Sequence, residues 1–195
     1  MHYIVGLGNP GEKYQNSRHN AGWIVLEDFV ASTGLPALYD SSKYSGRVSE
    51  GVVDGEEVSV LLPDTYMNKS GSAVKKLVPK DAVSQLVVVY DDIDLPVGEI
   101  KVSFGKGAGG HNGVQSVIDA MGSKDFIRIR IGIAATSFWT GKTKRPKGGG
   151  AMTRRVLGPF TSSERSKIDT ASNTVAEALF AIIKEGYVAA MNQYN

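Results

Sequence analysis

The sequence contains no cysteine, and this absence removes several classes of protein. Without thiols the chain has no disulfide framework, no thiolate nucleophile, and no zinc or iron–sulfur centre held by cysteine. Histidine is nearly as scarce, since only His2, His19 and His111 are present to exchange a proton near neutral pH. No run of apolar residues is long enough to cross a bilayer, so we expect no membrane partner.

Complete cofactor motifs are also missing. Gly6, Gly8 and Gly11 have the spacing of a dinucleotide-binding fingerprint, but Pro10 interrupts the motif and no helix opens at its third glycine. The glycine-rich stretch 105–110 lacks the Gly-Lys-Ser/Thr ending of a phosphate-binding loop, and there is no Gly-x-Ser-x-Gly elbow. We therefore expect no cofactor and no metal, and water as the nucleophile of any hydrolytic reaction.

Length and composition are those of an ordinary globular protein. The chain has 195 residues, of which 42% are hydrophobic and 22% charged, so we expect a single domain over residues 1–195. An apolar run begins at Tyr3, which leaves no room for a signal or transit peptide in this sequence. We therefore expect a cytoplasmic protein.

Positive charge is concentrated in one part of the chain. Residues 126–163 contain eight lysines and arginines and no acidic residue, whereas the formal net charge of the whole chain is only +2. Such a block indicates a surface that meets a polyanion, although a solvated loop that aids solubility is an equally good interpretation of charge alone. Residues 135–155 have little apolar content, so we predict a mobile basic loop there.

Hydrophobic periodicity predicts alternating strands and helices. Strands are expected at 3–7, 48–62 as a hairpin turning at Asp54-Gly55, 86–90, 99–104 and 126–134. Helices are expected at 21–30, 70–78 and 112–121, and from the capping box at 161–164 to Gly186. The pattern predicts an α/β fold, a single three-layer domain with a mixed, mostly parallel central sheet flanked by helices.

Polar groups follow four of the predicted strands or apolar runs. They lie in the segments 9–19, 67–68, 91 and 111–112. Because loops at the carboxyl ends of adjacent parallel strands meet in one crevice, we expect these groups to converge. A histidine beside a carboxylate and neutral amides is suited to general-base hydrolysis of an ester. Taken singly, each residue is better explained as a turn or helix-start residue.

Together these segments resemble bacterial-type peptidyl-tRNA hydrolase over essentially the whole chain. The resemblance is carried by five ordered motifs, Gly6-Leu7-Gly8-Asn9-Pro10-Gly11 continuing through Tyr14 to Arg18-His19-Asn20-Ala21-Gly22, Thr65-Tyr66-Met67-Asn68, Tyr90-Asp91-Asp92-Ile93-Asp94, Gly109-Gly110-His111-Asn112-Gly113 and Arg128-Ile129-Arg130-Ile131-Gly132. It implies a monomer that hydrolyses the ester between a peptide and the terminal ribose of tRNA.

The resemblance also assigns roles to individual residues. His19 matches the catalytic base and Asp91 its partner. The expected substrate-binding residues are Asn9, Tyr14, Met67, Asn68, His111 and Asn112.

On the tRNA side, the resemblance matches Lys101 and Arg130 to basic positions at the acceptor end and the CCA end. A second family lysine is Ser103 here, and Lys106 is its candidate substitute. From the charge pattern we add Lys142, Lys144 and Arg145 as expected tRNA contacts.

Two other functions remain open. The same fold is known, by resemblance, in an RNA-binding relative that serves as a splicing factor. An esterase acting on small acyl substrates is the second alternative, although it would not need the basic segment. The presence of His19, Asp91 and the asparagines favours hydrolysis of peptidyl-tRNA.

Overall fold

Buried apolar runs form the strands of one mixed sheet in the computed structural model, which describes residues 1–136, 143–146 and 148–195. The strands are β1 (His2–Gly6), β2 (Tyr39–Ser41), β3 (Gly46–Val53), β4 (Glu56–Pro63), β5 (Leu86–Pro96), β6 (Ile100–Phe104), β7 (Ile127–Thr136) and β8 (Thr143–Lys144). Their order is β2-β3-β4-β1-β5-β7-β6, with β8 paired to β7. The neighbours β4, β1, β5 and β7 run parallel, whereas the other pairings are antiparallel.

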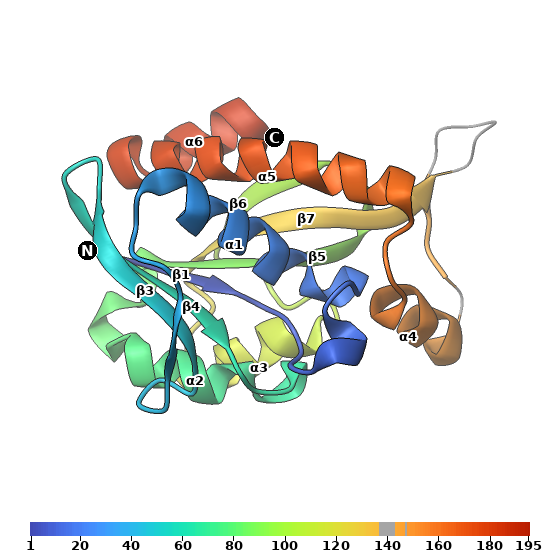
Figure 1. Ribbon diagram of the computed structural model, residues 1–195, viewed down its shortest axis with the longest axis horizontal. Coiled ribbons are helices and arrows are strands. Elements are labelled where there is room, and N and C mark those ends of the chain that lie inside the picture. Colours follow the sequence, from blue (N-terminus) through green and yellow to red (C-terminus); the bar gives the residue numbers. More distant parts are fainter. Residues whose placement is uncertain (137–142, 147) are drawn as a thin grey trace.

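Helices cover both faces of this sheet. They are α1 (Ala21–Thr33), α2 (Ser70–Leu77), α3 (Asn112–Met121), α4 (Gly149–Leu157), α5 (Ser162–Glu185) and α6 (Tyr187–Tyr194), with short 3-10 turns η1 (Glu12–Tyr14), η2 (Arg18–Asn20), η3 (Met67–Lys69) and η4 (Lys80–Gln85). Helices α1, α5 and α6 lie on one side of the sheet and α2 and α3 on the other (Figure 1). The predicted three-layer α/β class is therefore confirmed. Within the described residues, no helix has the length and apolar character that a membrane crossing requires.

Strand alternation divides the core into two clusters. In β7, Ile127, Ile129, Ile131 and Ile133 pack in the cluster that includes α1 and α5. Arg128 alternates with these isoleucines, so its side chain lies on the other face of the sheet. The predicted separation of isoleucines from arginines on β7 is thus confirmed.

Local turn and capping signals have the predicted effects. Asp54 and Gly55 have φ values of 52° and 85°, as a type I′ turn between β3 and β4 requires. The Thr161 side chain accepts from the Glu164 N–H, and the Glu164 carboxylate accepts from the Thr161 N–H, which completes the capping box of α5.

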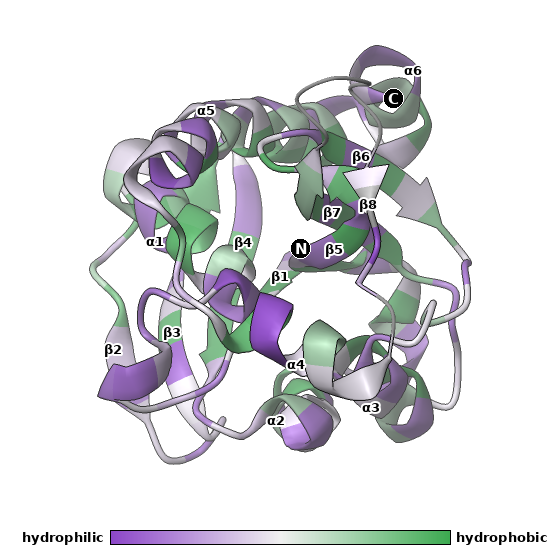
Figure 2. Ribbon diagram, turned by 90° about the vertical axis from the view of Figure 1, so that its right-hand side faces the viewer, coloured by the Kyte–Doolittle hydropathy of each residue, from purple (hydrophilic) through white to green (hydrophobic). Residues whose placement is uncertain are grey.

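The segment predicted as a loop over 135–155 contains regular structure. β7 continues to Thr136, the pair 143–144 forms β8, and α4 begins at Gly149. Met152 and Val156 lie one helical turn apart on the cavity side of α4, but the glycines and basic residues around them hide this short pattern in the sequence. Tertiary contacts support the helix, because the Arg155 guanidinium donates to the carbonyl of Ile133 and to the Glu164 carboxylate. Figure 2 looks onto the end of the molecule where α4 lies.

Candidate active site

Three of the four predicted polar segments converge at one edge of the sheet. Segments 9–19 and 67–68 follow β1 and β4, and Asp91 lies in β5, so the three come from neighbouring parallel strands. The fourth segment arrives by a different route. β6 runs antiparallel to β7 and ends opposite Ile127, and the glycine-rich loop 105–110 then runs back toward Asp91 before α3 begins.

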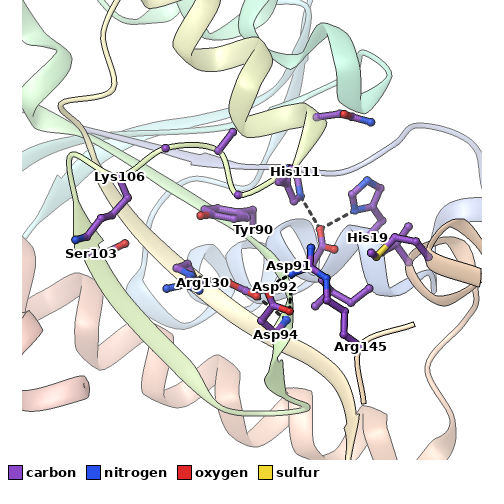
Figure 3. A pocket seen from close by; sticks show the side chains of 18 of the residues that line it. His19, Tyr90, Asp91, Asp92, Asp94, Ser103, Lys106, His111, Arg130 and Arg145 are labelled. Carbon is purple, nitrogen blue, oxygen red and sulfur yellow. Dashed lines mark hydrogen bonds and ion pairs between the residues drawn. The ribbon is translucent and has the colours of Figure 1, made fainter. Parts of the chain in front are cut away.

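A cavity of about 390 Å³ lies at this edge. Seven of the predicted site residues line it, namely His19, Asp91, Lys106, His111, Asn112, Arg130 and Arg145. Met152, Thr153 and Val156 of α4 also line it and were not predicted, because this segment was interpreted as a loop. Figure 3 shows His19 and His111 both directed at Asp91, with Ser103 and Lys106 at the far end of the cavity.

The His19–Asp91 pair is the centre of the site. Nδ1 of His19 lies 2.7 Å from Oδ1 of Asp91, and the Asp91 side chain is almost fully buried. Burial lowers the pKa of His19, but the negative charge of Asp91 and the hydrogen bond to it act in the opposite direction, and the net pKa of His19 is raised. The predicted pairing of these two residues is therefore present as a direct hydrogen bond.

Close backbone packing brings His19 to the sheet. Helix α1 starts directly after His19 and Asn20, and a Cβ on Gly22 would collide with the carbonyl oxygen of Val89 and lie 2.8 Å from the Leu7 nitrogen. Only glycine permits this approach of α1 to β1 and β5. Gly22 is thus the residue that allows η2 to stand beside Asp91.

Asn9 is buried in a network that sequence reasoning did not predict. The Asn20 side chain accepts from the Asn9 N–H at 2.9 Å and donates to the Asn9 carbonyl at 3.0 Å. The Asn9 side chain in turn accepts from the Met67 N–H at 2.8 Å. Asn20, which the sequence analysis names only as a member of the first motif, thus fixes the loop after β1.

The other predicted substrate residues lie around this network. Met67 is buried, and its sulfur approaches Gly113 at the start of α3. Asn68 is exposed beside it in η3, and Tyr14 is partly exposed in η1. None of Asn9, Tyr14, Met67 and Asn68 lines the cavity beside Asp91; Asn9 lines a separate hollow of about 480 Å³ together with Asn20 and Trp23.

His111 is engaged at both ring nitrogens. Nε2 lies 3.0 Å from Oδ1 of Asp91, while Nδ1 accepts from the N–H groups of Gly113 and Val114 at 3.2 Å each. Burial raises the pKa of Asp91, but interaction with His19 and His111 outweighs this effect and holds the pKa below its usual range. Asp91 is therefore an ionised acceptor shared by two imidazoles.

The same three residues form the one cluster with metal-ligand spacing in the part of the chain that the structure describes. Their candidate ligand atoms lie within 4.8 Å of one another. Both imidazoles, however, contact the same carboxylate oxygen at hydrogen-bond distances. The group is thus arranged as a hydrogen-bonded acid–base cluster rather than as separate ligands around a cation.

The predicted basic residues occupy different positions relative to the cavity. Arg130 pairs with Asp92, and Nη1 of exposed Arg145 lies 2.8 and 3.0 Å from the two carboxylate oxygens of Asp94. Lys106 is exposed on the cavity rim.

Three further predicted tRNA contacts lie outside the cavity lining. Lys101 is exposed and opposite Arg130 in the β6–β7 register, which puts both side chains on one face of the sheet. Lys144 belongs to β8, and Lys142 lies outside the described residues.

An ion-pair cluster behind His19 was also missed. Glu164 accepts from Arg18 at 2.6 Å and from Arg155 at 2.8 Å, and Arg18 also donates to the Arg155 carbonyl. Burial raises the pKa of Glu164, but hydrogen bonds from Arg18, Thr161 and Arg155 lower it to about 2. The capping-box motif revealed Glu164, but nothing in the local sequence indicated its two arginine partners.

Comparison with known proteins identifies the family of this chain. The family model described as "Peptidyl-tRNA hydrolase" matches residues 3–195. The "Peptidyl-tRNA hydrolase" proteins of Syntrophotalea carbinolica and Thermodesulfovibrio yellowstonii are each 40% identical, over the whole of this chain and 97% and 99% of their own lengths. The crystal structure of peptidyl-tRNA hydrolase from Acinetobacter baumannii has a TM-score of 0.86 and 32% identity, covering 100% of this chain and 94% of that one.

These similarities define the class of protein as an α/β ester hydrolase. The chain belongs to the peptidyl-tRNA hydrolase family.

Proposed function

We propose that this protein hydrolyses the ester bond between peptide and tRNA in peptidyl-tRNA, with His19 as the general base. The observation that carries the proposal is the short His19–Asp91 hydrogen bond at the wall of the cavity. Nδ1 of His19 faces the carboxylate, while Nε2 has no hydrogen-bond partner among the described residues. That nitrogen is therefore available to a water molecule.

The reaction follows from this geometry. Nε2 of His19 takes a proton from water as the water oxygen attacks the ester carbonyl, and the Asp91 carboxylate stabilises the resulting imidazolium. When the tetrahedral intermediate collapses, the carbon–oxygen bond to the ribose breaks and His19 returns the proton to the ribose oxygen. The products are a peptide acid and tRNA that can be used again in translation.

Neutral amides serve as the polar groups around the ester. Asn112 lines the cavity beside His111, and Asn9 is held in place by its bond from Met67. We infer that amide N–H groups of Asn9, Asn68 and Asn112 bind the peptide carbonyls, where a neutral donor stabilises developing negative charge.

The basic end of the cavity is suited to the acceptor stem and the CCA end of tRNA. Ser103 has a buried hydroxyl without a hydrogen-bond partner among the described residues, and Lys106 stands beside it on the rim. We infer that Lys106 and Arg130 contact phosphates, with Lys101, Lys142, Lys144 and Arg145 extending the contact along the stem. All the named groups belong to one chain, so we infer that the protein acts as a monomer. We also propose that it acts in the cytoplasm and needs neither a metal nor a cofactor.

His19→Ala tests the assignment of the base. We expect kcat on N-acetyl-aminoacyl-tRNA to fall about 10²- to 10⁴-fold while tRNA affinity is retained. Because the pKa of His19 is raised above 6.5, kcat of the wild type should decline as pH falls, with its midpoint above that value. His2→Ala, at the start of β1 and away from the cavity, is the matched control and should leave turnover unchanged. Wild-type turnover in the His19 variant would overturn the mechanism.

The two alternative functions give different results in the same assays. A protein that only binds RNA would bind tRNA without turning over any ester. An esterase for small acyl substrates would hydrolyse a simple aminoacyl ester as well as peptidyl-tRNA. We expect turnover of peptidyl-tRNA to exceed that of the simple ester. The basic rim adjoins the cavity that holds His19, so a bound tRNA would bring its ester to the base.

A further inference from the structure

The orientation of the His111 ring assigns it a role beyond lining the cavity. We propose that His111 is a positioning residue, locked by the N-terminus of α3 as the neutral tautomer with its proton on Nε2, which holds Asp91 in place for His19. The proposal rests on the proposed function, since it takes His19 as the base. It identifies what keeps the His19–Asp91 pair in its working geometry.

The backbone of α3 fixes which nitrogen carries the proton. His111 is the N-cap of α3, and its Nδ1 receives the N–H groups of Gly113 and Val114. A nitrogen that accepts hydrogen bonds needs its lone pair, so Nδ1 is unprotonated and the proton of the neutral ring is on Nε2. Adding a second proton at Nδ1 would place it against two N–H donors, at the positive end of the helix dipole.

The opposite side of the ring meets a carboxylate. Nε2–H points at Oδ1 of Asp91 over 3.0 Å, so donor and acceptor match without any further proton. Rotating the ring by half a turn would put carbon atoms against both the α3 N–H groups and Asp91. All three contacts therefore specify one ring orientation.

Packing holds the ring where these hydrogen bonds need it. The Tyr90 ring meets it edge-on at 4.9 Å between centroids, and the His19 ring lies at 5.0 Å. A Cβ on Gly113 would lie 3.1 Å from Cε1 of His111 and would collide with the sulfur of Met67. The absence of a side chain at Gly113 thus makes room for both neighbours.

The fixed ring of His111 holds the Asp91 carboxylate in place, and the carboxylate in turn orients the His19 ring. Oδ1 of Asp91 accepts from both imidazoles, one from η2 and one from the start of α3. With His111 always a donor, the carboxylate cannot turn away from His19 without losing a hydrogen bond in a nearly water-free setting. His19 then keeps its proton on Nδ1 and presents an unprotonated Nε2 to water.

Other charged groups face the same cavity. They are the Asp92–Arg130 and Asp94–Arg145 pairs and Lys106, and burial raises the pKa of Tyr90 to about 12, so its phenol stays neutral. The Asn and Gln variants of His111 both keep these residues, and both lose the ring contact with Tyr90. Differences between such variants therefore report on the contacts of His111 alone.

Two substitutions test the contacts of the two ring nitrogens separately. In His111→Asn, the side-chain oxygen replaces Nδ1 as the cap of α3, but its amide is too short to reach Asp91. In His111→Gln, the side-chain amide reaches toward Asp91 with a donor at the distance of Nε2. We expect both variants to fold, which their melting temperatures will check. His2→Asn, at the start of β1, is the control substitution.

The kinetic expectation is specific to positioning. His111→Asn should lower kcat about 10- to 100-fold with little change in KM. The acid limb of its kcat profile should move to higher pH, because an Asp91 with one donor fewer attracts a proton on His19 more strongly. His111→Gln should recover several-fold of the lost kcat. Equal kcat in the wild type and His111→Asn, or equal losses in the Asn and Gln variants, would overturn the proposal.

Nuclear magnetic resonance of the ¹⁵N-labelled histidine rings tests the tautomer without reference to catalysis. We expect the His111 ring to show a protonated Nε2 and a bare Nδ1 at the pH of the activity assays, as its contacts with Asp91 and the start of α3 require. A His111 ring that carries its proton on Nδ1 would overturn the inference. His19→Ala at wild-type turnover would instead overturn the proposed function, so the two failures are distinguishable.

Discussion

At the scale of the residue, Asn9 illustrates how one side chain combines support and recognition. Its Oδ1 accepts from the buried N–H of Met67, whereas its Nδ2 has no partner among the described residues. The oxygen therefore has a structural role, and the nitrogen is the group that the proposed function assigns to the peptide. An aspartate at this position would keep the first role and lose the second.

We predict that Asn9→Asp and Asn9→Ala fail in different ways. Asn9→Asp still accepts from Met67, so its stability should stay near that of the wild type, while kcat/KM falls because a negative charge replaces a donor. Asn9→Ala leaves the Met67 N–H unsatisfied and should lose about 1 to 3 kcal/mol of unfolding free energy. Urea denaturation and kcat/KM on the same preparations check both. Equal stability and equal kcat/KM in the two variants would contradict this division of roles.

At the scale of the element, Glu164 ties the start of α5 to both α4 and η2. Its carboxylate accepts from Arg155, which belongs to α4, and from Arg18, which immediately precedes His19. The backbone is joined at the same place, since Arg18 N–H donates to the Gly158 carbonyl and Phe160 N–H to that of Asn16. Three elements around the cavity are thus joined by one partly buried carboxylate.

We predict that Glu164→Gln destabilises the protein by about 1 to 2 kcal/mol at neutral pH, because two arginines lose their charged partner in a partly solvated setting. The folded-state pKa of Glu164 is lowered from 4.5 to about 2, so its contribution is complete above 4.5 and is lost as pH falls through about 2. The stability difference between wild type and variant should therefore shrink in acid. Thr161→Ala, which removes only the cap to α5, should cost about 1 kcal/mol at either pH. A constant difference from pH 7 to pH 2 would contradict this account.

At the scale of the whole molecule, positive charge is unevenly distributed. Residues 126–163 hold eight of the 22 lysines and arginines and no acidic residue, and this segment runs from β7 beside the cavity into α4. Figure 2 shows that β7, β8 and α4 all meet the viewer at the same end of the molecule. A polyanion at this end would contact the segment and the cavity together.

We predict that the salt dependence of tRNA binding comes from this end. Replacing Lys144 and Arg145 by glutamine should flatten the slope of log K against log salt by up to about 2. Replacing Lys167 and Lys184 of α5 removes the same charge from the other layer and should leave the slope unchanged. Titration of tRNA into each variant at several salt concentrations measures both slopes. If the slope changed equally in the two double variants, net charge rather than the position of the residues would explain the salt dependence, and the prediction would be wrong.

The sequence by itself determined the elements whose signals are local. The glycine stops of α1 and α3, the Asp54-Gly55 hairpin and the α5 capping box each depend on residues within a few positions of one another. The convergence of the loops after β1 and β4 with Asp91 followed from their sequence order, because parallel strands deliver their carboxyl ends to one edge.

Only the tertiary structure decided the contacts between distant segments. Arg18 and Glu164 are separated by 146 positions, and His111 reaches Asp91 through a loop that leaves an antiparallel strand. Helix α4 is joined to distant segments by Arg155, which donates to the Ile133 carbonyl and to the Glu164 carboxylate. Local patterns encode the hydrogen bonds of a turn or a helix, but a buried ion pair or a shared carboxylate exists only once packing has excluded water from around it.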